Sequence, residues 1–189
     1  NKLYNGCPGD MGWIVAKGGT STCGWEPANS IRFVAGGVKE NWQSGSVANA
    51  DTMLIFLREG LPRKGVPSTP LPISCQAILE DDPLAASGIY TIDPNGGDAN
   101  DALAVYCDMD DDGGGWTMVY KKTGDVSGHP AGLWQLSDLG ARDQTLLSKG
   151  PSPRDYANPF GIDDWAAFSE ARVEVIAGVN LPMLIRLDS

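Results

Sequence analysis

A proline-rich stretch limits the folds that are open to this chain. The residues from Gly60 to Ile73 include four prolines, at positions 62, 67, 70 and 72. Proline has no backbone N–H to donate to a helix or a strand ladder, so this stretch is expected to form neither. We therefore predict an extended linker over residues 61–73, which separates a block of residues 1–60 from a block of residues 74–189.

Short strands joined by turns are the expected secondary structure of both blocks. Glycine and proline supply 24 and 13 of the 189 residues, a composition that favours turns over long helices. The apolar run Thr52–Arg58 predicts a strand that is buried on both faces. Ser74 is the expected N-cap of a short helix over residues 74–80. The other expected elements are strands at 12–16, 31–34, 89–92, 102–107, 116–120, 172–176 and 183–187, and single helical turns at 133–139 and 144–148.

The four cysteines are Cys7, Cys23, Cys75 and Cys107, and they show no CxxC or Cys/His spacing typical of a metal site. An even number of cysteines beside turns favours two disulfides and an oxidising compartment, and the alternative is four buried thiols in a cytosolic protein. The chain opens without a secretory signal. For an extracellular protein, we therefore expect a processed form or a fragment.

The charge balance excludes several classes of partner. The chain carries 24 acidic and 14 basic residues, a formal net charge of -10. Such a chain repels phosphate backbones and anionic lipid surfaces, so we expect no nucleic-acid binding and no peripheral membrane binding. No apolar run is long enough for a membrane-spanning helix, so we expect no membrane insertion. The acidic excess lies in the second block.

An acidic run after one predicted strand is a candidate metal site. Asp108, Asp110, Asp111 and Asp112 offer carboxylate oxygens on a loop, which are the ligands that Ca²⁺ prefers. The run lacks the downstream glutamate of an EF-hand loop, and a solvated turn is the alternative interpretation. Ca²⁺ is thus the one cofactor that the sequence suggests.

Two tryptophans in turn-like contexts, Trp25 and Trp42, are candidate platforms for a sugar ring, and the alternative is that they belong to the core. Enzyme signatures are missing from the sequence. The single histidine, His129, lies in a predicted turn, and no nucleophile elbow, Walker motif or dinucleotide fingerprint occurs. We therefore expect a protein that is not an enzyme.

An ordered series of motifs in the second block resembles the opening of the fibrinogen-related domain, the module of fibrinogen chains, ficolins, tachylectins and, more distantly, intelectins. The series is Ser74-Cys75-Gln76-Ala77-Ile78-Leu79-Glu80, Ser87-Gly88-Ile89-Tyr90-Thr91-Ile92-Asp93-Pro94, Val105-Tyr106-Cys107-Asp108-Met109 and Asp112-Gly113-Gly114-Gly115-Trp116-Thr117. In the first block, Cys7 and Cys23 resemble the family's second disulfide, and Thr52–Arg58 resembles its final strand. The C-terminal half of the domain would then precede the N-terminal half.

This resemblance implies an α+β fold of mostly antiparallel strands, short helices and long loops, with the disulfides Cys7–Cys23 and Cys75–Cys107. Residues 1–60 would be the C-terminal half and residues 74–189 the N-terminal half of the domain. The resemblance places the family's acetyl-group pocket around Cys7, Cys23 and Trp25. The family's calcium site does not carry over, because Asn1–Gly6 contains no acidic residue.

The function that the resemblance implies is extracellular or cell-surface recognition of glycans or proteins by a multivalent assembly. We expect neighbouring copies to complete each other's half-domains and so form an oligomer or filament. The alternative is a soluble monomeric lectin, a circularly permuted domain that binds glycans. Ser68 and Thr69, between prolines of the linker, are candidate O-glycosylation sites.

Overall fold

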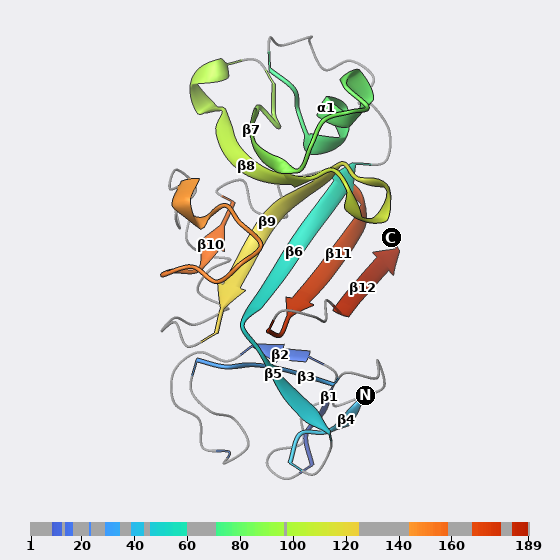
Figure 1. Cartoon of the computed structure of the whole chain (residues 1–189), viewed down its shortest axis with the longest axis vertical. Helices are drawn as coiled ribbons and strands as arrows, with labels where there is room; N and C mark the ends of the chain where they lie inside the picture. Colours follow the sequence, from blue (N-terminus) through green and yellow to red (C-terminus); the bar gives the residue numbers. More distant parts are fainter. Residues whose placement is uncertain are drawn as a thin grey trace.

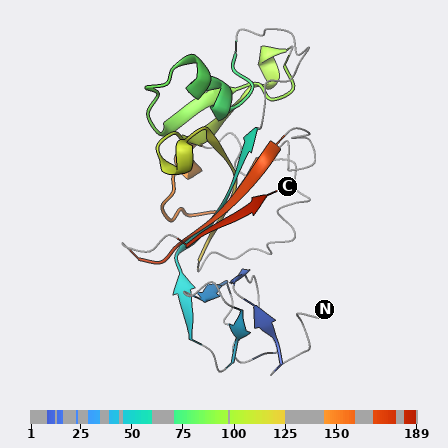
Figure 2. The ribbon, with the colours of Figure 1, turned by 90° about the vertical axis from the view of Figure 1, so that its right-hand side faces the viewer.

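The protein is described by a computed structural model, shown in Figure 1 and, turned by a quarter, in Figure 2. The structure describes residues 9–12, 14–16, 23, 29–34, 39–43, 46–59, 71–96, 98–124, 144–158, 168–178 and 183–188. All strand pairs in these ranges are antiparallel. With one short α-helix among the described residues, this confirms the predicted mostly antiparallel α+β class.

A seven-stranded sheet forms the larger part of the fold (Figure 1). Its strands follow one another in the order β12-β11-β6-β9-β8-β7, and β10 also pairs with β9. The strands are β6 (Thr52–Glu59), β7 (Gly88–Ile92), β8 (Leu103–Asp108), β9 (Trp116–Thr123), β10 (Tyr156–Ala157), β11 (Phe168–Ile176) and β12 (Met183–Asp188).

The strand β6 comes from the first sequence block but lies inside this sheet, between two strands of the second block. It pairs with β11 from Thr52↔Ile176 to Glu59↔Phe168, and with β9 from Thr52↔Thr123 to Leu57↔Thr117. The apolar run that predicted a strand buried on both faces is therefore confirmed. In this structure, one and the same chain supplies both the sheet and the strand that completes it.

Apolar side chains pack on both sides of the sheet. One core gathers Leu57, Ile92, Val105, Val119 and the disulfide cysteines, with Ile78 and Leu79 of α1 (Cys75–Asp81) packed against it. The second core contains Leu54, Phe56, Trp116, Met118, Leu146, Leu147 and Tyr156. Because neighbouring side chains of β6 enter different cores, every residue from Leu54 to Leu57 packs against apolar neighbours.

The helix α1 begins where the sequence predicts. The Ser74 hydroxyl accepts a hydrogen bond from the Ala77 backbone N–H at 3.1 Å, which confirms Ser74 as the N-cap. A disulfide joins Cys75, the first residue of α1, to Cys107 of β8, as the resemblance implied. Cys23 is disulfide-bonded as well, but its predicted partner Cys7 lies outside the described residues, so that pair stays a prediction.

Two small sheets lie at the other end of the molecule (Figures 1 and 2). Their strands are β1 (Met11–Gly12) and β4 (Glu40–Asn41), and β2 (Ile14–Ala16), β3 (Ile31–Val34) and β5 (Val47–Ala50). Asp51 connects β5 to β6, and its side chain accepts a hydrogen bond from Gly178 N–H at 2.6 Å. Its backbone N–H donates to the Ile176 carbonyl at 2.8 Å, so this residue ties the small sheets to the large one.

The remaining differences from the sequence expectations concern short elements. The structure contains β4, β5 and β10, which were not predicted, and the 3₁₀ turns η1 (Ala99–Asp101) and η2 (Asp111–Gly113). The expected helical turn at 144–148 is a 3₁₀ turn, η3 (Gln144–Leu146). The turn expected at 133–139 and the linker residues 61–70 lie outside the described residues.

Truncation of a side chain tests the position of β6. Leu54→Ala removes a fully buried leucine from the second core, and we expect the free energy of unfolding to fall by about 2–5 kcal/mol. Leu84, 91% exposed, provides the matched control, and Leu84→Ala should change this free energy by less than about 0.5 kcal/mol. Urea unfolding measured by tryptophan fluorescence compares the two. Equal effects would contradict the burial of β6.

Candidate functional site

The acidic run predicted from the sequence forms a tight turn between β8 and β9. Three successive glycines adopt positive φ angles there, +84° at Gly113, +72° at Gly114 and +73° at Gly115. A Cβ on Gly114 would lie 2.3 Å from the Met109 carbonyl oxygen, and a Cβ on Gly115 would lie 2.1 Å from Gln76 Oε1. Only glycine fits both the angles and the space, so the triplet shapes this turn.

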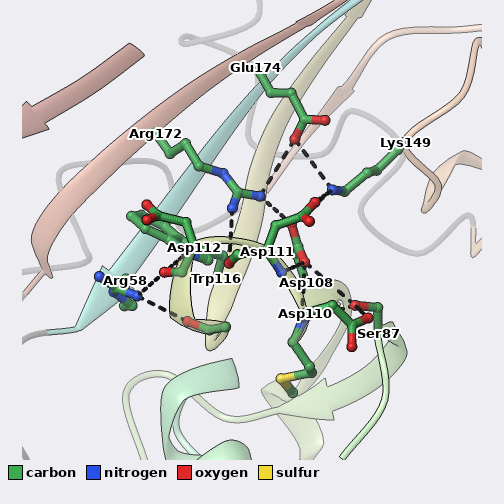
Figure 3. A network of polar contacts seen from close by, with 12 residues as sticks. Arg58, Ser87, Asp108, Asp110, Asp111, Asp112, Trp116, Lys149, Arg172 and Glu174 are labelled. Carbon is green, nitrogen blue, oxygen red and sulfur yellow. Dashed lines mark hydrogen bonds and ion pairs between the residues drawn. The ribbon is translucent and has the colours of Figure 1, made fainter. Parts of the chain in front are cut away.

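Asp108 lies at the centre of a charged network around this turn (Figure 3). Its buried carboxylate pairs with Arg172 of β11 and, at 2.8 Å, with Lys149 Nζ. It also accepts backbone hydrogen bonds from Asp111 and Asp110, at 3.1 and 3.3 Å. Burial raises the pKa of this carboxyl, but the hydrogen bonds from Lys149 and Arg172 outweigh burial and lower the pKa to about 2.

Lys149 bridges three carboxylates. Its Nζ lies 2.8 Å from Asp108 Oδ2, 2.7 Å from Asp111 Oδ2 and 3.4 Å from Glu174 Oε2. Burial lowers the pKa of this ammonium group, but the three carboxylates outweigh burial and raise it. Lys149 is therefore a fixed positive charge among these carboxylates.

A second lysine holds the segment that carries Lys149. Lys121 of β9 is fully buried, and its Nζ donates to the backbone carbonyls of Ser148 at 3.1 Å and Gly150 at 3.3 Å. Burial lowers the pKa of Lys121 to about 8. Because these carbonyls flank Lys149, Lys121 positions the lysine that faces the acidic turn.

Two arginines join the turn to the neighbouring strands. Arg172, 0% exposed, binds Asp108 and the Asp111 carbonyl, and its guanidinium lies 4.5 Å from the centre of the Phe56 ring. Arg58 of β6 lies 4.2 Å from the centre of the Trp116 ring and binds Glu170 of β11. The network thus connects residues of β6, β8, β9 and β11 (Figure 3).

The structure brings together all four residues of the candidate calcium site. Asp108 and Asp111 face cations, Asp110 accepts a hydrogen bond from Ser87 at 2.6 Å, and the Asp112 carbonyl accepts one from Arg58 at 2.9 Å. Among the described residues, no group of three or more His, Cys, Asp or Glu residues is arranged to hold a metal ion. Calcium binding here stays a prediction.

The remaining candidate residues are the two tryptophans and the two hydroxyl residues of the linker. Trp42, 3% exposed, packs against Val34, so it belongs to the core, which was the stated alternative, and offers no exposed platform. Its ring lies against Gly12, where an added Cβ would come within 2.7 Å of the indole, and this missing side chain allows the burial. Trp25 and the O-glycosylation candidates Ser68 and Thr69 lie outside the described residues and stay predictions.

The sequence analysis missed five charged residues of this network. They are Arg58, Lys149, Glu170, Arg172 and Glu174. One signal could have found three of them. Charged residues interrupt otherwise apolar strands in Phe56-Leu57-Arg58 and in Arg172-Val173-Glu174-Val175, and a charge in a buried strand needs a partner. The sequence does not show which partner that is.

The antiparallel sheet, the disulfide-tethered helix and the glycine turn define a disulfide-bonded α+β module. Comparisons with known proteins find similar sequences for part of it. Residues 63–132 match the model of the fibrillar collagen C-terminal domain. The chain is 42% identical to Tenascin from Mus musculus over 80 residues, which are 42% of this chain and 3% of the relative.

Two further relatives are also similar in sequence to part of this chain. The chain is 45% identical over 51 residues to the fibrinogen alpha-2 chain from Petromyzon marinus, covering 26% of this chain and 8% of the relative. It is 42% identical over 62 residues to a techylectin-like protein from Phoneutria nigriventer, covering 33% and 21%. The matched part of this chain is thus similar in sequence to parts of tenascin, a fibrinogen chain and a techylectin-like protein.

These matches cover part of each chain. The matched stretches span between 3% and 21% of these relatives' lengths. No solved structure matches the chain. In the part of the chain that the structure describes, no helix has the length and apolar character to cross a membrane.

The low pKa of Asp108 predicts a pH dependence of stability. A carboxyl whose pKa is about 2 when folded and 3.8 ordinarily stabilises the fold above about pH 4, and this contribution is lost as the pH falls towards 2. It amounts to about 2 kcal/mol. Asp108→Asn should reduce the decrease in unfolding free energy between pH 4 and pH 2 by this amount. Asp81→Asn, at an exposed position, should leave that decrease unchanged. Urea unfolding at several pH values measures both, and parallel curves would contradict the assignment.

The glycine turn gives a second prediction. Gly114→Ala forces a side chain into a positive φ angle and against the Met109 carbonyl, so we expect a loss of more than about 1 kcal/mol in unfolding free energy. At Gly150 an added Cβ meets nothing within 4 Å, so Gly150→Ala is the matched control and should lose less than half as much. Thermal unfolding of the two variants measures the difference. A Gly114→Ala variant as stable as the native chain would show that the turn is not constrained as described.

Proposed function

We propose that this chain is a non-enzymatic extracellular recognition module, in which a strand from the first sequence block completes a fibrinogen-like sheet. The observation that carries this proposal is the position of β6, whose sequence resembles the last strand of the family, between β9 and β11. If the C-terminal half of the domain precedes the N-terminal half in the sequence, a strand of the first block must lie in the sheet of the second block. The division into half-domains at 1–60 and 74–189 is part of the proposal.

The proposed module assembles with copies of itself into an oligomer or filament. A β6 strand supplied by a neighbouring copy would make the same pairs with β9 and β11 as the chain's own strand. A head-to-tail exchange of this kind forms a ring where the rotation between copies closes and a filament where it does not. The prolines between residues 61 and 70 limit the conformations of the connection, which lowers the advantage of closure within one chain.

The second candidate function is a soluble monomeric lectin, a circularly permuted domain that binds glycans. Two observations favour it: β6 comes from the same chain in this structure, and one relative is named a techylectin-like protein. Its ligand pocket would lie near the second predicted disulfide, where the family resemblance places Cys7, Cys23 and Trp25. In this function, Ca²⁺ at Asp108, Asp110, Asp111 and Asp112 would be the candidate cofactor.

Light scattering coupled to size-exclusion chromatography separates the two functions. We expect the purified chain to elute as species of several times 20.0 kDa at micromolar concentration, because exchanged strands join copies. A 20.0 kDa particle at every concentration, together with glycan-array binding that is lost on chelation of Ca²⁺, would instead establish the monomeric lectin. A monomer that binds no glycan would contradict both functions.

A further inference from the structure

Hydrophobic burial alone leaves the register of β6 weakly fixed. Leu54 and Phe56 pack into one core and Ile55 and Leu57 into or against the other, so the strand is apolar on both faces. A strand with one polar face would place that face in the core when it slips by one residue. Over its apolar run, β6 has no polar face, so a slip by one residue would bury no polar side chain. Directional contacts at the two ends of the strand must therefore fix its position along β9 and β11. At the start of the strand, Asp51 binds Gly178 and Ile176.

Arg58 makes the directional contacts at the C-terminal end of β6. Its Nη1 donates hydrogen bonds to the backbone carbonyls of Asp112 at 2.9 Å and Gly114 at 3.2 Å. Its Nε donates to Glu170 Oε2 at 2.6 Å, and Nη2 binds the same carboxylate oxygen. The guanidinium also lies over the Trp116 ring. We call these four partners, the two carbonyls, Glu170 and Trp116, the guanidinium socket.

The guanidinium socket suits arginine and no other side chain. The planar guanidinium donates in several fixed directions and lies flat on an aromatic ring, whereas an ammonium group is a point charge. At Gly113 an added Cβ would lie 3.3 Å from Nη1, so the absence of a side chain there leaves room for the arginine. A slip of β6 by two residues would move Arg58 by about 7 Å and empty the socket.

We propose that the guanidinium socket recognises an arginine near the end of an extended strand, and that Arg58 determines which strand completes the sheet and in which register. The strand that fills the socket in this structure is the chain's own β6. In the assembled state, the occupant is β6 of a second copy of this chain, and in that respect the inference rests on the proposed function. Arg58 is thus a specificity-determining residue.

Disulfide trapping tests the register. Ile55 lies opposite Val173 in the pairing of β6 with β11, and Ala171 lies opposite Leu57, so Ala171 meets position 55 only after a slip of two residues. One variant carries Ile55→Cys with Val173→Cys, and the other carries Ile55→Cys with Ala171→Cys. In the full-length chain with Arg58, we expect the first pair to form a disulfide about tenfold more than the second, as peptide mapping measures.

Substitutions at position 58 then test the socket. Arg58→Ala should bring the ratio of the two disulfides down towards one, and Arg58→Lys should lower it less, because it keeps the charge but not the fork. Lys39→Ala, which removes an exposed cation elsewhere, should leave the ratio unchanged. A tenfold ratio that persists in a folded Arg58→Ala variant would overturn the inference. If that variant does not fold, an unchanged ratio in Arg58→Lys overturns it.

Non-reducing electrophoresis of the first pair separates this inference from the proposed assembly. Disulfides between chains, seen as a ladder, support a β6 strand supplied by a second copy. Disulfides only within single chains, at every concentration, would exclude the second copy as occupant. In that outcome, a ratio that falls on substitution of Arg58 would still establish the socket for the chain's own strand.

Discussion

The contact of two arginines with one indole holds the middle of the large sheet together. Arg58 of β6 and Arg172 of β11 lie 4.2 and 4.8 Å from the centre of the Trp116 ring, on β9. The three strands are neighbours in the sheet, so this contact reinforces their backbone pairing with side-chain contacts on one face. Because Arg58 belongs to the first sequence block, the same contact also joins that block to the second.

Buried charges make this arrangement sensitive to change. Arg172 is fully buried, and bringing a guanidinium out of water is costly unless carboxylates and carbonyls compensate for the lost hydration. Asp108 and Glu174 supply the opposite charge, and Lys149 balances the remaining carboxylates. Each group is therefore needed by the others, since removal of one partner leaves a buried charge without compensation.

Local patterns in the sequence were sufficient to predict most of the long strands and the helix. The apolar run of β6 and the capping serine of α1 are signals that a few adjacent residues give without distant partners. Both predictions are confirmed. The short strands β5 and β10 were missed, whereas β3, also of only four residues, was predicted because three of its four residues are large and apolar. The existence of β5 and β10 depends on partners that are distant in the sequence.

The charged network shows why the site was harder to predict. Asp108 and Arg172 are 64 residues apart, and only the fold brings them together. The acidic run was recognised as a candidate site, but its partners on β6 and β11 were not. Trp42 illustrates the same difficulty, because its burial depends on the missing side chain of Gly12 across a sheet pair.

The disulfide between Cys75 and Cys107 has a consequence for the response of the molecule to proteolysis. It encloses the exposed turn that connects β7 to β8, where Asn95 and the residues of η1 are accessible. Exposed turns of this kind are preferred sites of proteolytic cleavage. A protease that cuts there would produce two polypeptides that stay covalently joined, with β7 still paired to β8. The module can thus be nicked at this turn without being released in pieces.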